Sequence, residues 1–270
     1  MRTVQLEKLR PDEILEEKKR TSIVYLPLGP LEWHGPAMPY GTDPLAAEAI
    51  ARRSAEITGG VVMPTVYLGT ERERSPEMLD ALGFEDTSQY IVGQDFPANS
   101  MKSYYSKEEV FSLVVREYLR MLVQQEYRLI VIVNGHGAAN QAYALERLAV
   151  EFSNETASQV IVIMPLVQLD ESDQDLGHAT RQETAIQMAL APENVDLSKL
   201  PPKTVKLKNS EWGIDDGCTF ALQPNKDKTV IYDPRDATEE LGRKYIAKGV
   251  EAVTDQVSKK WSELSGKKNR

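Results

Sequence analysis

Acidic and histidine side chains gather early in the chain in a pattern that suits metal ligation. Glu32, His34 and Asp43 fall within twelve residues. Glu32 and His34 are two apart, so on an extended chain both side chains point the same way. Carboxylates and imidazoles without cysteine suit Zn, Mn or Fe at a hydrolytic site, where two cations about 3.5–4 Å apart share a carboxylate and make a nucleophile at neutral pH. The segment therefore predicts part of a metal centre.

The three histidines of the chain share one context, because each adjoins glycine. They are His34, His136 and His178. Glycine lets the backbone turn sharply, so the neighbouring side chain can project into a cleft. A single histidine is more often structural than a ligand, but three in this context, with acids nearby, indicate one site.

Each acid also has a structural interpretation. Glu32 beside His34 is compatible with a surface carboxylate and a hydrogen-bonded imidazole. Asp43 precedes Pro44, a pair typical of a helix start, with Asp as the N-cap and Pro as the first helical residue. The segment 180–183 (TRQE) matches a capping box, in which Glu183 bonds back to the cap residue. A carboxylate has two oxygens, so a cap and a site residue can be the same side chain.

Strands that alternate with helices must position these residues. Expected strands cover 22–28, 61–68, 128–133 and 160–166, and expected helices cover 10–20, 43–57, 106–125, 138–152, 180–191 and 241–264. This alternation predicts an α/β fold with a mostly parallel sheet. Ligands bind such sheets beyond the carboxyl ends of the strands, where Glu32, His34 and His136 fall. The irregular segment 69–105 is expected to be a substrate-loop insert.

Composition limits the partners. The 270 residues, 41% hydrophobic, suffice for a single domain over 1–270. A net charge of -9 argues against a nucleic-acid partner. No apolar run approaches the ~18 residues of a membrane span, and the first residues lack the apolar core of a signal peptide. The one cysteine, Cys218, permits no intrachain disulfide. We therefore predict a cytoplasmic protein with no nucleic-acid and no membrane partner.

Three segments resemble motifs of the creatininase family of metal-dependent amidohydrolases. They are LPLGPLEWHGPAMPYGTD (26–43), IVNGHGAAN (132–140) and GHATRQETA (177–185). They are similar to the family's E-x-H-G with G-x-D, its N-G-H-G-G-N and its G-H-A-G-x-x-E-T-S, in the same order. The resemblance implies a three-layer α/β/α sandwich, two divalent metal ions (Zn, Mn or Fe) and a small-molecule substrate. It also implies a homo-oligomer, as a hexamer or trimer of dimers.

The resemblance also implies the ligand set. One metal maps onto Glu32, Asp43 and His136. The other maps onto His34, with Asp43 as the bridge. The family's further glutamate ligand corresponds to Ala138 here, so this part of the pattern fails.

Glu183 is the candidate that replaces the missing ligand, and it is a candidate catalytic residue as well. His178 matches the family's histidine that acts as acid and base or contacts substrate. The implied reaction is attack of a metal-activated hydroxide on a carbonyl carbon.

Departures from the family pattern lie beside the expected pocket and bear on the substrate. Ala37-Met38 replaces the usual His-Leu, Ala98-Asn99-Ser100 replaces Gly-Thr, and the loop 135–140 is one residue longer. Creatinine is therefore a poor candidate; a cyclic amide or a keto-inositol ring, which one subgroup of the family opens, fits the resemblance better. Glu71, Arg72 and Arg74 would suit a hydroxyl-rich ring. The expected substrate contacts are Trp33, Tyr40, Asn99 and Ser100.

Two other classes of function remain open. The loop 135–140 resembles a dinucleotide-binding turn, with Asn140 in place of the third glycine, so a nucleotide-dependent enzyme is one alternative. The other is a non-catalytic binding protein on the same scaffold. The complete set of acids and histidines argues against a decayed site.

Overall fold

A parallel β-sheet forms the middle layer of the computed structural model, which describes residues 3–173, 175–212, 229–230 and 232–266. The strand order is β2-β1-β4-β5, and β3 also pairs with β1. The strands are β1 (Ile23–Gly29), β2 (Val61–Val62), β3 (Val66–Tyr67), β4 (Leu129–Asn134) and β5 (Gln159–Ile163). Cys218 lies outside the described residues.

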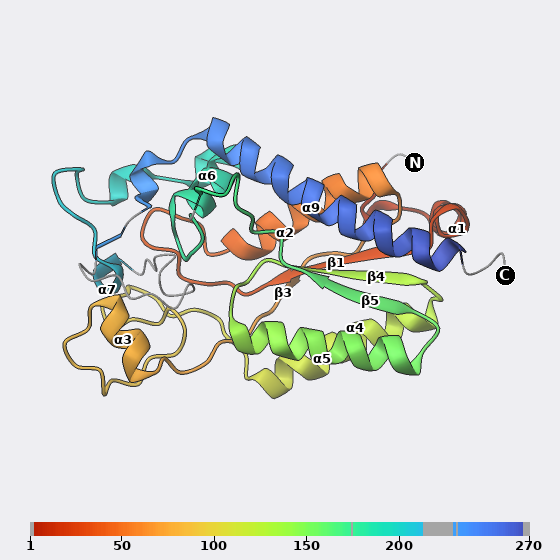
Figure 1. The fold of residues 1–270 in the computed structure, drawn as a ribbon, viewed down its shortest axis with the longest axis horizontal. Helices are drawn as coiled ribbons and strands as arrows, with labels where there is room; N and C mark the ends of the chain where they lie inside the picture. Colours follow the sequence, from red (N-terminus) through yellow and green to blue (C-terminus); the bar gives the residue numbers. More distant parts are fainter. Residues whose placement is uncertain (1–2, 174, 213–228, 231, 267–270) are drawn as a thin grey trace.

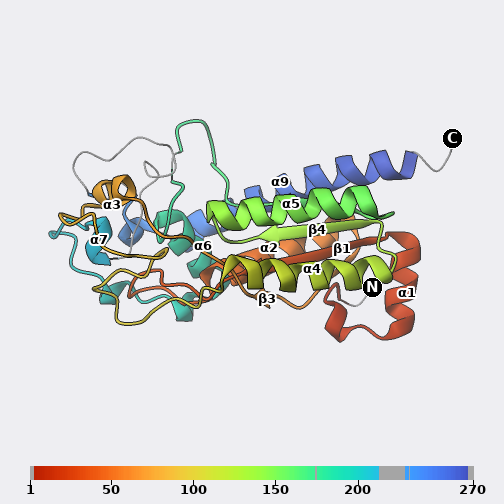
Figure 2. The same cartoon turned by 90° about the horizontal axis from the view of Figure 1, so that it is seen from below.

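Helices cover both faces of the sheet, which confirms the predicted α/β/α layers (Figures 1 and 2). One layer contains α2 (Thr42–Thr58), α6 (Arg181–Leu190) and α9 (Glu239–Gly266), and the other contains α4 (Glu108–Gln124) and α5 (Ala139–Glu155). The remaining helices of the described residues are α1 (Pro11–Arg20), α3 (Pro76–Leu82) and α7 (Asn209–Trp212), with short 3-10 turns at Leu6–Lys8, Pro192–Asn194, Leu197–Lys199 and Pro234–Asp236. Among the described helices, none is both long and apolar enough to cross a membrane.

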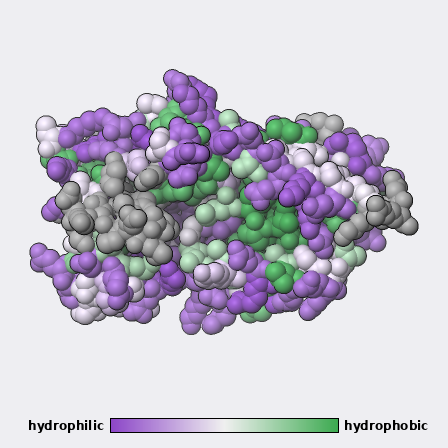
Figure 3. Space-filling model, in the orientation of Figure 1, coloured by the Kyte–Doolittle hydropathy of each residue, from purple (hydrophilic) through white to green (hydrophobic). Residues whose placement is uncertain are grey.

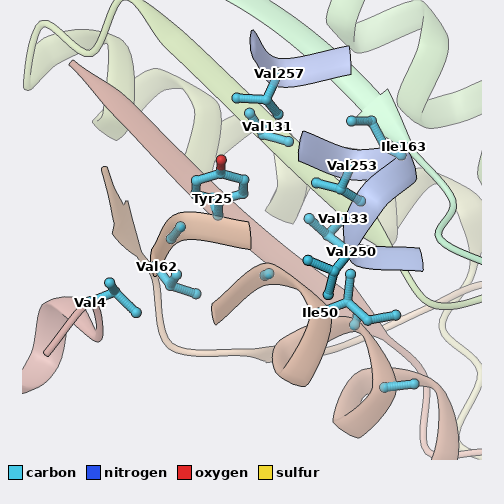
Figure 4. Packing of buried hydrophobic residues seen from close by; sticks show 14 of the residues in the cluster. Val4, Tyr25, Ile50, Val62, Val131, Val133, Ile163, Val250, Val253 and Val257 are labelled. Atoms are coloured by element: carbon cyan, nitrogen blue, oxygen red, sulfur yellow. The ribbon is translucent and has the colours of Figure 1, made fainter. Parts of the chain in front are cut away.

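Strand β1 is buried along its whole length because it has apolar side chains on both faces. Ile23 and Tyr25 pack into the cluster that α2 and α9 cover (Figure 4). Val24 and Leu26 point the other way, toward α4 and α5. Burying each such side chain contributes roughly 1.5–3 kcal/mol, so β1 is firmly fixed between the two layers.

The carboxyl ends of β1 and β4 lie side by side. Leu28 is in register with Asn134, so the segments that follow both strands leave the sheet together. Gly135 allows close contact with the start of α2, because a Cβ there would overlap the carbonyl oxygen of Asp43. The sheet register and this glycine thus bring three separate parts of the chain together.

Two local expectations are wrong. The predicted strand 61–68 is split into β2 and β3, with Pro64, which lacks an amide hydrogen, in the gap between them. Asp43 is not the N-cap of α2: the helix begins at Thr42 after Gly41, so Asp43 lies in the first turn.

The segment 69–105 lies beyond the strand ends and contains α3. It has an apolar cluster of its own, formed by Leu79, Leu82, Ile91 and Phe96. At one edge of the sheet, β5 has only β4 as a partner among the described strands. Figure 3 shows hydrophobic side chains gathered over β5, between α9 and α5.

Contact between α6 and α9 depends on Gly242, where an added Cβ would overlap the carbonyl oxygen of Ala185. We expect Gly242→Ala to force the two helices apart and to lower the free energy of unfolding by about 1–3 kcal/mol. Gly266→Ala is the matched control, because a Cβ there meets nothing within 4 Å. Chemical denaturation measures both; equal stability of the two variants would contradict this account of the packing.

Candidate metal centre

The segment after β1 directs Glu32 and His34 into a buried space. The amide of Glu32 donates to the carbonyl of Tyr40 (2.9 Å), and Gly35 turns the chain at φ 77°. Nδ1 of His34 lies 3.1 Å from the carbonyl oxygen of Glu32 and donates to it. That bond leaves Nε2 of His34 as the nitrogen available to a metal ion, and it faces the interior of the site.

Asp43 stands between two histidines. Its Oδ1 lies 3.0 Å from Nε2 of His34, and its Oδ2 lies 3.0 Å from Nδ1 of His136. The side chain of Asn134 fixes the turn that carries His136. Its Nδ2 donates to the His136 carbonyl (2.8 Å), and its Oδ1 accepts from the backbone amide of His136 (3.1 Å). Gln141 donates to the same Asn134 oxygen (2.8 Å).

Glu183 bonds to the backbone ahead of α6 and faces the histidines, but it does not form the predicted capping box with Thr180. Its Oε2 accepts from the amide of Ala179 (2.5 Å), one residue before the N-cap Thr180 that the capping box predicted. The same oxygen is 3.7 Å from Nε2 of His34. Ala179 has φ 51°, a left-handed conformation that is unusual for a residue with a Cβ, and the Glu183 bond stabilises it.

His178 is oriented by a backbone group. Its Nε2 donates to the carbonyl of Trp33 (2.5 Å), so Nδ1 carries the lone pair, 3.9 Å from Oε2 of Glu32. Its ring also lies against that of His34, with centroids 4.1 Å apart.

The six side chains fit a metal centre. Three groups of ligand atoms lie within 4.8 Å of one another: Glu32, Asp43 and His136; His34, Asp43 and Glu183; Glu32, His34 and His178. Two ligands about 2.1 Å from an ion and at right angles lie about 3 Å apart, close to the separations around Asp43.

All six residues are at most 6% exposed. Three atoms of this cluster are among the buried polar atoms that lack a hydrogen-bond partner in the described part of the chain: Glu32 Oε2, His34 Nε2 and His136 Nε2. Buried charges are normally paired or metal-bound.

Burial and neighbouring charges push the pKa values of the cluster apart. Burial would raise the pKa of Asp43, but the charges and hydrogen bonds of His34 and His136 together outweigh it and lower that pKa. Burial would lower the pKa of His34, but Asp43 and Glu183 outweigh it and raise that pKa to about 10. Burial dominates at Glu183, whose pKa rises to about 8, and at His178, whose pKa falls well below its ordinary value. At Glu183, burial thus outweighs the charge of His34, and a bound cation would lower that pKa.

A pocket of about 350 Å³ opens onto this cluster. One part of its wall is polar and comes from the segment 69–105, with Arg72, Arg74 and Gln94. Another part comes from α5 and its preceding loop, with Ala138 and the exposed ring of Tyr143. The cluster therefore lies at the base of a cleft with room for a small substrate.

The predicted substrate contacts lie apart from the described lining of this pocket. Trp33 and Tyr40 pack edge to face, 6.3 Å between centroids, and Trp33 contributes its carbonyl to His178. Asn99 donates to the carbonyl of Gln94 (2.5 Å), and Ser100 is exposed. Their role in substrate binding stays a prediction.

Sequence reasoning missed Tyr105. Its hydroxyl donates to Oε1 of Glu32 (2.5 Å) and accepts from the backbone amide of Gln94 (3.1 Å). Nothing local indicates this role, because Tyr105 and Glu32 are 73 residues apart. The only signal was the irregular composition of the segment that contains it.

Comparison with known proteins identifies relatives over most of the chain. The family model described as creatininase, creatinine amidohydrolase, matches residues 7–257. A mycofactocin precursor peptide peptidase from Mycolicibacterium smegmatis is 26% identical over 88% of this chain and 85% of its own length. A creatinine amidohydrolase from Pseudomonas putida is 24% identical over 67% of this chain and 70% of its own length.

Solved structures share the fold. A structure described as creatininase Mn has a TM-score of 0.66 and 20% identity, covering 96% of this chain and 99% of its own. A mutant creatininase of Zn-Zn type has a TM-score of 0.65 and 20% identity, covering 96% and 98%. The layered architecture therefore recurs at low sequence identity.

Tyr105 orients Glu32, so Tyr105→Phe should weaken metal binding. Partners behind a metal ligand typically contribute about 10- to 100-fold to metal affinity or activity. Tyr104→Phe is the matched control, because Tyr104 is 61% exposed and contacts the ring of Tyr40. Competition with a chelating indicator measures the affinity for Mn²⁺ and Zn²⁺. Equal affinities in the two variants would refute the role of the Tyr105 hydroxyl.

Proposed function

We propose that this chain, which belongs to the creatininase family and is a metal-dependent hydrolase, cleaves a carbon–nitrogen amide bond at a centre of two divalent cations. One observation carries the proposal. The two oxygens of Asp43 face different histidines, His34 and His136, at 3.0 Å each. A carboxylate that serves two imidazoles in this way suits a bridge between two ions.

The remaining ligands follow from the groups around Asp43. Glu32 and His136 would complete one cation site, and His34 with Glu183 the other. Mn or Zn suits these oxygen and nitrogen donors, and the solved relatives described as Mn and Zn-Zn types support that choice. When bound, the cations would act as Lewis acids that polarise the substrate carbonyl and lower the pKa of a water molecule.

His178 would transfer the proton. Because Nε2 is held by the Trp33 carbonyl, only Nδ1 is free to accept a proton, and it faces the cluster at 3.9 Å from Glu32. Its pKa is lowered by burial and by the charge of His34, so the imidazole is neutral at pH 7. It would take a proton from the attacking water and deliver it to the leaving nitrogen. A direct catalytic role of Glu183 stays a prediction.

Amide cleavage is favoured over cleavage of a keto-inositol ring by the nature of the relatives. One is named as an amidohydrolase and the other as a peptidase, and both names denote hydrolysis of carbon–nitrogen bonds. The peptidase relative extends the candidates from cyclic amides to linear ones. The substrate would be small, because the pocket measures about 350 Å³.

The alternatives explain the site less well. In a nucleotide-binding loop the turn 135–140 would face phosphate, but His136 faces the carboxylates of Glu32 and Asp43 at 3.1 and 3.0 Å. Without bound cations, those carboxylates would repel a phosphate group. A non-catalytic protein would have no need for buried, unpartnered ligand atoms. The predicted homo-oligomer, cytoplasmic location and lack of nucleic-acid and membrane partners stay predictions.

Two histidine variants separate metal binding from proton transfer. We expect His136→Ala to lose bound metal and activity together, because His136 is placed as a ligand. We expect His178→Ala to keep at least half of the metal but to lose activity by about 10²–10⁴-fold. Elemental analysis and turnover, measured on the same samples, distinguish them. Full metal and full rate in the His136 variant would remove it from the centre, and loss of metal in the His178 variant would make it a ligand.

Removal of metal should abolish hydrolysis without unfolding the protein. A chelator-treated sample is expected to lose activity and to regain it with Mn²⁺ or Zn²⁺, since the cations supply the electrophile. The metal-restored protein should hydrolyse lactams or short peptides rather than keto-inositols. A mass-spectrometric screen of the three substrate classes measures this. Ring opening of keto-inositols alone would overturn the proposed amide hydrolysis.

A further inference from the structure

The polar wall of the pocket contains a positive charge that the catalytic proposal does not use. Arg72 is exposed and lines the pocket. Its guanidinium has no ion-pair partner among the residues that the structure describes, although the carboxylate of Glu71 lies next to it in sequence. That carboxylate accepts from the backbone amide of Arg72 (2.9 Å) instead.

The backbone that carries Arg72 is held in place. The amide of Gly93 donates to the Arg72 carbonyl (3.0 Å), and the amide of Arg74 donates to the carbonyl of Ile91 (2.8 Å). Arg72 and Arg74 are two residues apart on this extended segment, so their side chains leave it on the same side, and both line the pocket. The charge of Arg74 is fixed further by the bond from Nε to the Gly93 carbonyl (2.8 Å).

Gln94 provides a second and independent observation. It lines the same pocket, is 4% exposed, and its Oε1 is a buried acceptor that has no hydrogen-bond partner within the described ranges. A buried acceptor left unpaired loses the hydrogen bond it would make to water and is destabilising. A donor that arrives with the substrate would remove this cost.

Resting on the function proposed above, we propose that Arg72 and Gln94 form the recognition subsite of the enzyme, which binds an amide substrate with a free carboxylate. The guanidinium of Arg72 pairs with the carboxylate, and Oε1 of Gln94 accepts the N–H of an amide. A planar guanidinium matches a carboxylate with two parallel hydrogen bonds. The substrate class is therefore an amide acid, either cyclic (a lactam acid) or linear (a peptide with a free C-terminus).

Charge balance in the pocket favours such a substrate. Two divalent cations would more than neutralise the carboxylates of Glu32, Asp43 and Glu183. The guanidinium of Arg72, which has no ion-pair partner among the described residues, then adds positive charge to the pocket. A neutral ring would leave the charge of Arg72 unused, whereas an acid neutralises it.

Matched probe pairs test the subsite. The cyclic pair is 5-oxoproline and 5-oxoprolinamide, and the linear pair is N-acetylalanylalanine and its carboxamide. Calorimetry on the Mn-loaded protein gives dissociation constants, and NMR follows hydrolysis. In at least one pair we expect the acid to bind about tenfold to hundredfold more tightly than the amide. The pair with that preference identifies the cyclic or the linear source.

Variants then test the residues. Arg72→Gln should bring the acid-to-amide ratio close to one, and Arg120→Gln, which removes an exposed arginine on α4, should preserve it. Gln94→Leu should weaken both members of a pair alike. Thermal denaturation of each variant verifies that it is folded.

The outcomes separate the subsite from the reaction. Equal affinities for acid and amide in both pairs would overturn the subsite. An acid preference that survives Arg72→Gln would also overturn it, because the carboxylate would then be binding the cations. Tight, Arg72-dependent binding of acids without hydrolysis of any amide would support the subsite and contradict the proposed amide hydrolysis.

Discussion

The carboxylate of Asp43 is the group on which the centre depends. It connects His34, which follows β1, with His136, which follows β4, and it is itself held in the first turn of α2. An isolated charge that is only 3% exposed would be strongly unfavourable. Here the charges of two imidazoles outweigh burial and lower the pKa of Asp43. The same contacts that make its burial tolerable therefore fix the relative positions of two strand ends and a helix.

Other site residues have a bond to a group outside the cluster that sets their orientation. His178 is held by the Trp33 carbonyl, and Glu183 by the amide of Ala179. The left-handed conformation of Ala179 costs of order 1–3 kcal/mol, a strain that the bond to Glu183 helps to offset. Orientation of the ligands by groups behind them is typical of metal centres, and it gives the arrangement a rigidity that the six side chains alone would lack.

The sequence predicted the parts of the site that local patterns determine. Strand ends beside glycine gave His34 and His136 because a parallel sheet brings such ends together. The capping interpretation of Asp43 failed because contact with two histidines satisfies its carboxylate inside the first turn. The contact of Tyr105 with Glu32 could not be predicted from the sequence, because the bond spans 73 residues and no local pattern encodes it. The same holds for His178 and the Trp33 carbonyl, because a backbone acceptor has no sequence signature.

The proposed recognition subsite and the candidate metal centre are physically connected. The backbone amide of Gln94 donates to the Tyr105 hydroxyl, which donates in turn to Glu32. A shift of the segment that carries Gln94 would therefore change the hydrogen bonding of a candidate metal ligand as well as the shape of the pocket. Substitutions in the segment 69–105 that change substrate preference are therefore constrained. Side chains such as Arg72 can vary on a fixed backbone, but the backbone at Gln94 cannot move without disturbing the candidate centre.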